Sequence, residues 1–346
     1  MSRERVRRAI TFGGPDRIPL SMEIPQATIG RYGDRLRDLM SQFESDFGSS
    51  GWKPGLDSPE PVRHSDTEWT DEWGVRWREP QSGLMGIPVG HPLADWNALR
   101  SYRVPRTLHG DFSDVPEALS SERHNRWVSA YGGRLFERMQ WLRGSENLLM
   151  DLVSPSGEVY ELRDMIIQSY LEAIEHWLEY DVDAIGFEDD WGGQQSLIIS
   201  PARWRDFFRP AYQLMFEPVQ AAGKQIFFHT DGLVWDILPD LLDMGVAYMN
   251  VQYALLGLER LGREFAGRLA FHLDLDGQHF MPNATPEQVK EHVWTLVTTL
   301  GSFSGGLILD AWVTPDVPWA NIHAMFGAFA ELGRGLSGGS DVRSSS

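Results

Sequence analysis

The sequence predicts an α/β fold, a (β/α)8 TIM barrel built as a single domain with a long N-terminal lid insertion. Three observations indicate it. Short apolar runs alternate with long amphipathic stretches, as buried strands alternate with covering helices in parallel α/β proteins. Each apolar run closes with a polar side chain, and parallel strands bring such ends to one face of a barrel. The chain has 346 residues, a length that accommodates a barrel with insertions.

The predicted strands are short apolar runs that end in polar residues. The clearest is residues 224–232, Lys-Gln-Ile-Phe-Phe-His-Thr-Asp-Gly, where the apolar run gives way to a histidine, an aspartate and a turn-forming glycine. Runs of the same kind occupy residues 17–23, 126–131, 183–190, 246–252, 268–274 and 306–310. We expect their polar ends to converge on one rim.

The amphipathic stretches between these runs predict the helices. Ser200-Pro201 and Thr285-Pro286 mark two helix starts, because serine or threonine caps a helix and proline suits its first position. The expected helices cover residues 2–12, 27–46, 134–143, 156–180, 201–222, 235–244, 285–300 and 318–332.

One long segment, residues 48–115, does not continue this alternation. It is rich in glycine, proline, tryptophan and charge, and residues 68–78 within it alternate aromatic and polar side chains as a hairpin does. We therefore expect an ordered lid inserted into one barrel domain that covers residues 1–334. The composition of residues 335–346 predicts a disordered tail.

Composition limits the function. Lysine and arginine number 31 against 49 aspartates and glutamates, a net charge of −18 that disfavours binding to nucleic acid. The chain has no cysteine, so disulfides, thiolate metal ligands and cysteine nucleophiles are excluded. The amino terminus lacks the apolar core of a secretion signal, and no run is apolar for long enough to cross a bilayer. The expected location is cytoplasmic.

Polar residues at the predicted strand ends are the candidate site residues, namely Glu23, Glu188, Asp190, His229, Asp231 and Asp310. Tryptophans beside these ends, Trp73, Trp191 and Trp312, suit a planar or hydrophobic substrate. The polar residues and the tryptophans each have a simpler structural interpretation. Tryptophans often pack in cores, a run of three carboxylates is often a solvated loop, and a strand can end in a core histidine with a capping aspartate.

The order of motifs resembles the uroporphyrinogen decarboxylase superfamily, whose members are TIM barrels. The similarity runs from about residue 3 to 333 and includes Phe-His-Thr-Asp-Gly at 228–232 and Asp-Leu-Asp-Gly-Gln at 274–278. Further matching stretches lie at residues 5–19, 189–195, 199–201 and 315–322. The true decarboxylase has an Arg-Gln-Ala-Gly-Arg stretch after its first strand. Here Glu23 stands close to where such a cation is wanted, and its charge would repel a porphyrinogen with many carboxylates.

The other large branch of this superfamily comprises methyltransferases that pass a methyl group to or from a corrinoid protein through zinc. The resemblance of this sequence to that branch implies that His229 is a metal ligand and that Asp231 replaces the first cysteine ligand. It also implies that Ala311 falls near the position of the second cysteine ligand, with Asp310 beside it. Glu188 is the candidate extra ligand. Such nitrogen and oxygen ligands suit zinc first, and also manganese or ferrous iron. The alternative is a His229 and Asp231 pair that binds substrate directly by hydrogen bonds.

The resemblance implies a metal-dependent methyltransferase acting on a small methylated compound, with an O-methyl compound expected first. Glu23, Asp190 and His229 are the expected catalytic residues. The expected substrate-binding residues are Asp71, Trp73, Trp191, Gln194, Gln252, Asp274 and Trp312. The chain lacks the corrinoid-binding pattern Asp-x-His-x-x-Gly, so a separate partner protein would carry the corrinoid.

Two other functions remain open at this point. The first is a metal-independent decarboxylase or related lyase acting on a small carboxylic acid or a uroporphyrinogen-like substrate. In it Asp71 or His229 would protonate a carbanion, and Arg31, Arg76 or Arg78 would face the barrel mouth. The second is a ligand-binding barrel without turnover. The sequence also leaves a homodimer open.

Overall fold

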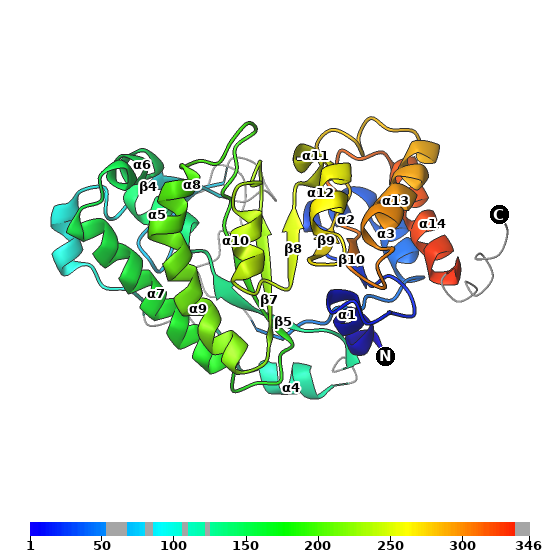
Figure 1. Ribbon diagram of the computed structural model, residues 1–346, viewed down its shortest axis with the longest axis horizontal. Coiled ribbons are helices and arrows are strands. Elements are labelled where there is room, and N and C mark those ends of the chain that lie inside the picture. The colour runs from blue at the N-terminus through cyan, green and yellow to red at the C-terminus, as the bar shows by residue number, and fades with distance from the viewer. Residues whose placement is uncertain (53–67, 80–85, 106–109, 122–124, 336–346) are drawn as a thin grey trace. The chain divides into compact units, whose positions relative to one another are not determined.

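A computed structural model describes residues 1–52, 68–79, 86–105, 110–121 and 125–335 (Figure 1). Contacts divide the chain into two compact units. Unit 1 comprises Met1–Gly48, Glu122–Val128 and Ala247–Ser346, and unit 2 comprises Ser49–Ser121 and Ser129–Val246. Each unit contains parallel strands with helices packed around them, as the alternation in the sequence predicts.

Unit 2 is built on three parallel strands, β5 (Ser129–Gly133), β6 (Ala184–Glu188) and β7 (Gln225–Thr230), with β6 in the middle. Burial alternates along β7, so its fifth residue, His229, lies on the partly exposed face while Phe228 and Thr230 are buried. His229 is in register with Glu188 of β6. The carboxyl ends of β6 and β7 therefore lie side by side.

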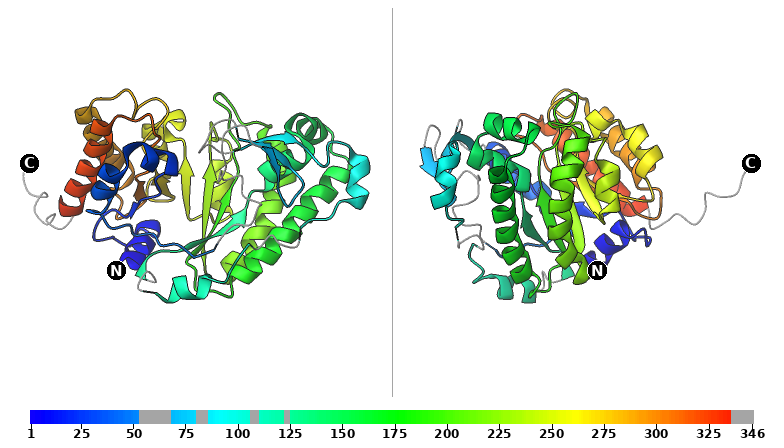
Figure 2. Two further views of the ribbon diagram at one scale, coloured as in Figure 1. Left: turned by 180° about the vertical axis from the view of Figure 1, so that it is seen from behind. Right: turned by 60° about the vertical axis from the view of Figure 1, so that its left-hand side comes forward.

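Along the chain, helices follow each of the three parallel strands of unit 2. The long helices α7 (Gly157–Trp177) and α9 (Arg209–Ala221) pack against each other (Figure 1, Figure 2). A π-helical turn, η3 (Trp204–Phe208), leads into α9. The remaining helices of the unit are η1 (Trp96–Ser101), α4 (Val115–Ser120), α5 (Leu135–Arg143), α6 (Ser145–Val153), α8 (Pro201–Arg203) and α10 (Leu238–Asp243).

A small antiparallel sheet also belongs to unit 2. It consists of β2 (Glu68–Thr70), β3 (Arg76–Arg78) and β4 (Ile87–Gly90), paired in that order. The hairpin predicted for residues 68–78 is thus confirmed. The rest of the predicted lid falls partly on residues 53–67, 80–85 and 106–109, which lie outside the described residues.

Unit 1 contains four parallel strands in the order β1 (Leu20–Ser21), β10 (Leu307–Asp310), β9 (Ala270–Leu273) and β8 (Tyr248–Val251). Helices α12 (Leu258–Phe265), α13 (Pro286–Leu300) and α14 (Trp319–Gly335) lie next to one another in that order (Figure 1). The other helices are α1 (Ser2–Ile10), α2 (Gln26–Tyr32), α3 (Asp34–Met40) and α11 (Tyr253–Leu256).

Local sequence signals explain several of these boundaries. The Thr285 hydroxyl accepts from the Gln288 N–H while the Gln288 side chain accepts from the Thr285 N–H, a capping box that starts α13 at Pro286. At the start of α8, the Ser200 hydroxyl accepts from the Arg203 N–H and so caps that helix. The helix predicted for residues 27–46 is two shorter helices because Gly33, with φ +57°, separates them. Helix α6 is an addition that the sequence analysis does not predict.

Among the described residues, no helix is both long and apolar enough to span a bilayer. The predicted tail, residues 335–346, falls almost entirely outside the described residues. The boundaries proposed for a single barrel domain and its insertion stay predictions.

Candidate metal centre

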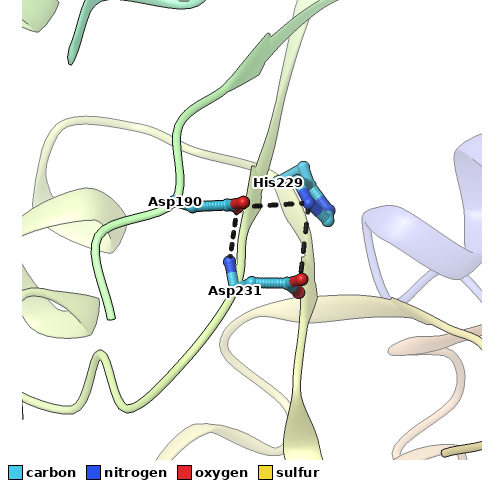
Figure 3. Close-up of side chains that lie close together, drawn as sticks. All are labelled: Asp190, His229 and Asp231. Atoms are coloured by element: carbon cyan, nitrogen blue, oxygen red, sulfur yellow. Dashed lines mark hydrogen bonds and ion pairs between the residues drawn. The ribbon is translucent and has the colours of Figure 1, made fainter. Parts of the chain in front are cut away.

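Three side chains meet at the carboxyl ends of β6 and β7 in unit 2 (Figure 3). The Nε2 atom of His229 lies 3.5 Å from Oδ1 of Asp190 and 4.0 Å from Oδ1 of Asp231. One ligand atom from each residue lies within 4.8 Å of the other two. The three side chains are 31–45% exposed, so the group is partly buried at the strand ends. We refer to Asp190, His229 and Asp231 as the triad.

Two loops position the triad, one after β6 and one after β7. The pairing between these strands continues past their ends, because the Asp189 N–H donates to the His229 carbonyl (3.0 Å) and the Gly192 N–H to the Asp231 carbonyl (2.9 Å). The Asp231 N–H donates to Oδ1 of Asp190 at 3.0 Å. The loops are thus held together by backbone hydrogen bonds on both sides of the triad, which fixes Asp190 against β7.

The electrostatics of the triad favour a positive charge at its centre. Burial lowers the pKa of His229, but the hydrogen bond with Asp190 and the charges of Glu188 and Asp231 outweigh burial and raise that pKa to about 10. Burial raises the pKa of Asp190, and the bond with His229 overcomes it and lowers that pKa below its usual range. His229 is therefore an imidazolium between the two carboxylates at neutral pH.

Glu188, the ligand predicted beside His229, has a different partner. Its carboxylate forms an ion pair with Arg134, which lies between β5 and α5 and also contacts Glu137 at 3.3 Å. Burial raises the pKa of Glu137 to about 8, and the charges of Asp189, Asp190 and Glu188 add to this while Arg134 opposes it. Arg134 is not among the residues predicted from the sequence, because the strand that precedes it gives no sign of an ion pair with Glu188.

Asp189 and Trp191, on either side of Asp190, are fully buried. The Asp189 carboxylate accepts hydrogen bonds from the backbone N–H groups of Phe136 (2.9 Å) and Glu137 (2.8 Å) in the first turn of α5. The Trp191 ring stacks on Phe136 with centroids 4.1 Å apart. These contacts anchor the loop to α5 and leave Asp190 as the residue of this segment that points outward.

Three of the predicted substrate-binding residues are buried. Trp73 and Trp191 are 1% and 0% exposed and serve core packing. Asp71 is buried too, and it accepts from the Val75 N–H (2.8 Å) and the Trp77 indole N–H (2.9 Å) and lies 3.4 Å from the Arg138 guanidinium. These residues have no free surface with which to bind a substrate in this structure.

Gln194 is exposed in the loop that follows the triad residue Asp190. The other predicted site residues belong to unit 1. They lie at the ends of its parallel strands, as the fold requires: Glu23 after β1, Asp310 as the last residue of β10 with Trp312 after it, Asp274 after β9 and Gln252 after β8. Glu23 and Trp312 are exposed, whereas Asp310 is 8% exposed.

Asp310 has a histidine neighbour that the sequence analysis does not assign to the site. Nε2 of His272 lies 3.5 Å from Oδ2 of Asp310, and the Glu23 N–H donates to Oδ1 at 3.4 Å. Burial raises the pKa of Asp310 to about 7, the charge of Asp274 adds to this, and hydrogen bonds from Glu23 and Ser21 oppose it. The position of His272 at a strand end, in Phe-His-Leu-Asp, is the signal that could have found it.

The donor set of the triad fits a divalent cation. Two atoms bound to one zinc ion at roughly 2.0–2.2 Å can lie no more than about 4.3 Å apart. The distances from His229 to both carboxylates, 3.5 and 4.0 Å, meet this limit. One imidazole and two carboxylates also form a common set for zinc, manganese or ferrous iron.

The chain is similar to one protein family and to several solved structures. The family model described as uroporphyrinogen decarboxylase (URO-D) matches residues 138–332. A solved structure of a methyltransferase from Methanosarcina mazei is similar over 95% of this chain and 98% of that chain, with 15% identity and a TM-score of 0.66. The GH26 domain of an endo-beta-mannanase/endo-beta-glucanase from Prevotella bryantii gives a TM-score of 0.45 at 9% identity over 94% and 93% of the two chains. A search of curated proteins found no match. The likeness to the methyltransferase confirms the predicted α/β fold of TIM-barrel type.

Proposed function

Because the chain belongs to the uroporphyrinogen decarboxylase family, we propose that it is a metal-dependent methyltransferase. It would move a methyl group from a small methylated compound, in the first place an O-methyl compound, to a corrinoid carried by a separate protein. The observation that carries this proposal is the triad, in which one ligand atom each from His229, Asp190 and Asp231 lies within 4.8 Å of the other two. The structural likeness to a protein named as a methyltransferase supports it.

Asp190, His229 and Asp231 would hold the ion, with zinc as the first choice. A bound ion of this kind supplies Lewis acidity toward an ether oxygen and makes the demethylated oxygen a better leaving group. Glu188 would stay paired with Arg134 and contribute negative charge near His229. Glu23 remains the proposed general acid or base, and Asp190 takes the role of a ligand in place of acid–base catalysis.

A methyltransferase of this kind needs a partner. The sequence has no Asp-x-His-x-x-Gly pattern, which supports a corrinoid carried on a separate protein. The net charge of −18 supports a small molecule and a protein partner over nucleic acid.

The decarboxylase alternative is less well supported. One of its two candidate proton donors, Asp71, is buried and already accepts two hydrogen bonds, and the other, His229, belongs to the triad. Two of its candidate anion-binding residues, Arg76 and Arg78, lie on β3 and pair with the exposed Glu68 at 3.8 and 2.7 Å. These arginines are therefore engaged with a surface carboxylate of the small sheet.

Two measurements on the same preparation test the proposal. Protein purified without chelators should contain one divalent ion per chain by elemental analysis. With methoxylated substrates and free cob(I)alamin it should produce methylcobalamin, followed by absorbance. His229→Ala should lose both the ion and the activity, while His323→Ala, at an exposed histidine of α14, should keep both. Decarboxylation of a carboxylic acid by metal-free protein would contradict the proposal.

A further inference from the structure

The immediate neighbours of Asp190 fix where this ligand stands. Asp189 and Trp191 are fully buried, while the side chain of Asp190 between them is 45% exposed. Because the residues on both sides of Asp190 are buried, the side chain of Asp190 is directed outward from the core. The contacts of those two neighbours therefore act together with the hydrogen bond from the Asp231 N–H to Asp190 in placing Asp190 beside His229.

One hydroxyl group contacts both neighbours. Tyr212 lies on α9 and is 1% exposed. Its hydroxyl donates to Oδ2 of Asp189 at 2.5 Å and accepts from Nε1 of Trp191 at 3.0 Å. The Tyr212 oxygen is thus a single atom that ties together the residues before and after Asp190.

The same two neighbours are held from other directions. Oδ2 of Asp189 also accepts from the Phe136 N–H, and Oδ1 accepts from the Glu137 N–H. The Trp191 backbone N–H donates to the Thr230 hydroxyl at 3.2 Å. Thr230 stands between His229 and Asp231 in sequence and is fully buried. Tyr212 and Thr230 thus bracket the segment, one from α9 and one from β7.

Removing the Tyr212 hydroxyl would have a defined local effect. The buried Asp189 carboxylate would lose one of three donors, and the Trp191 indole N–H would lose its acceptor in a site closed to water. Both losses favour rearrangement of residues 189–191. The ring of Tyr212 would still fill its place between Trp191 and Phe228, so the core would keep its packing.

We propose that Tyr212 is a positioning residue of the triad, because its hydroxyl sets the placement of Asp190 relative to His229 and so the affinity of the triad for its ion. This inference rests on the proposed metal-dependent function. The Tyr212 hydroxyl acts through its bonds to Asp189 and Trp191, the neighbours of the ligand Asp190. Partners of this indirect kind typically change metal affinity by about 10- to 100-fold when they are removed.

Titration of the full-length apoprotein with Co²⁺ tests the proposal, because it reports both the Kd and the visible absorption spectrum of the bound ion. Tyr212→Phe should bind Co²⁺ about 10-fold or more weakly, with a changed spectrum. Tyr102→Phe is the matched control. It removes a hydroxyl that donates to the Trp73 carbonyl at 2.9 Å elsewhere in unit 2, and it should bind as the wild type does.

A second pair of variants keeps the test informative if Tyr212→Phe folds poorly. Thr230→Val removes the acceptor of the Trp191 N–H and should weaken Co²⁺ binding, whereas Thr230→Ser keeps a hydroxyl and should restore it. If Tyr212→Phe, Thr230→Val and the wild type gave equal Kd values and spectra, Tyr212 and Thr230 would not set the placement of Asp190. The metal site itself would still be supported. A wild-type protein that binds no Co²⁺ would overturn the proposed function and this inference together.

Discussion

The backbones of Gly192 and Gly232 are in direct contact. A Cβ atom on Gly232 would lie 2.0 Å from the Gly192 carbonyl oxygen, and one on Gly192 would lie 2.3 Å from the Leu233 nitrogen. Neither position can carry a side chain. The contact joins the loop that bears Asp190 to the loop that bears Asp231, so the two glycines are what allows these carboxylates to face one histidine.

Substitution of Gly232 by alanine should therefore disrupt the triad and lower stability. The new methyl group meets backbone, which cannot move aside as a flexible side chain can, and φ is +84° at this position. We expect a loss of about 3 kcal/mol or more in the free energy of unfolding, measured with urea, together with loss of metal binding.

Gly223→Ala is the matched control for this prediction. Gly223 also has a positive φ, +68°, but no atom lies within 4 Å of its Cβ position. The backbone strain alone should cost about 1 kcal/mol and leave metal binding unchanged. Equal stability losses in Gly232→Ala and Gly223→Ala would show that the contact between the loops is unimportant.

A pair of carboxylate variants distinguishes the ligand that the structure favours from the one that the sequence favours. Asp190→Asn removes a charged oxygen 3.5 Å from His229 and should weaken zinc binding by about 10-fold or more. Glu188→Gln removes a carboxylate that is already paired with Arg134, so its zinc affinity should stay within about 3-fold of the wild type. Isothermal titration of the apoproteins measures both, and the reverse order of effects would make Glu188 the ligand.

This difference shows what the sequence could and could not reveal about the site. The strand ends were predictable because each apolar run closes with a polar residue, and parallel pairing then places Glu188 in register with His229. Which carboxylate reaches His229 depends on the path of the loop after β6. That path depends on a contact between two glycines, and Glu188 is taken up by Arg134, which lies between β5 and α5. Neither feature leaves a periodic trace in the sequence.

The tryptophans show the same limit from the other side. Trp73 and Trp191 stand beside polar residues in the sequence, as a substrate-binding aromatic would, yet both are buried. Trp191 stacks on Phe136 of α5, a partner 55 positions earlier in the chain that sequence spacing does not reveal. Trp312, at 38% exposed, keeps the exposure that the substrate-binding prediction requires.

Asp71 is expected to stabilise the protein rather than to take part in a reaction. Asp71→Ala would leave the buried Arg138 without this carboxylate, and the Val75 and Trp77 N–H groups without an acceptor. Loss of one partner of a buried ion pair costs about 3–5 kcal/mol, which urea unfolding would measure. The surface variant Glu68→Ala, which breaks the exposed pair with Arg78, should cost about 1 kcal/mol or less. An Asp71→Ala protein with wild-type stability and no activity would instead support a catalytic role.

Glu137 should make stability fall as the pH rises. Burial raises its pKa in the folded protein to about 8, against an ordinary value of 4.5. Between these values the folded chain holds a proton that the unfolded chain has released, so the folded state binds more protons and each step up in pH favours unfolding. Glu137→Gln removes this proton equilibrium. As the pH rises from 5 to 8, the unfolding free energy of this variant should therefore increase relative to that of the wild type. The slope is on the order of 1.4 kcal/mol per pH unit at most, which gives a total of a few kcal/mol.

Urea unfolding of both proteins at several pH values in this window measures that gain. Glu161→Gln, at an exposed glutamate of α7, controls for the change in net charge and should run parallel to the wild type. If the difference in unfolding free energy between Glu137→Gln and the wild type did not change with pH, Glu137 would release its proton at the same pH in the folded and the unfolded protein. The ion pair with Arg134 would then outweigh burial, and Arg134 would hold two ionised carboxylates, Glu137 and Glu188, beside the triad.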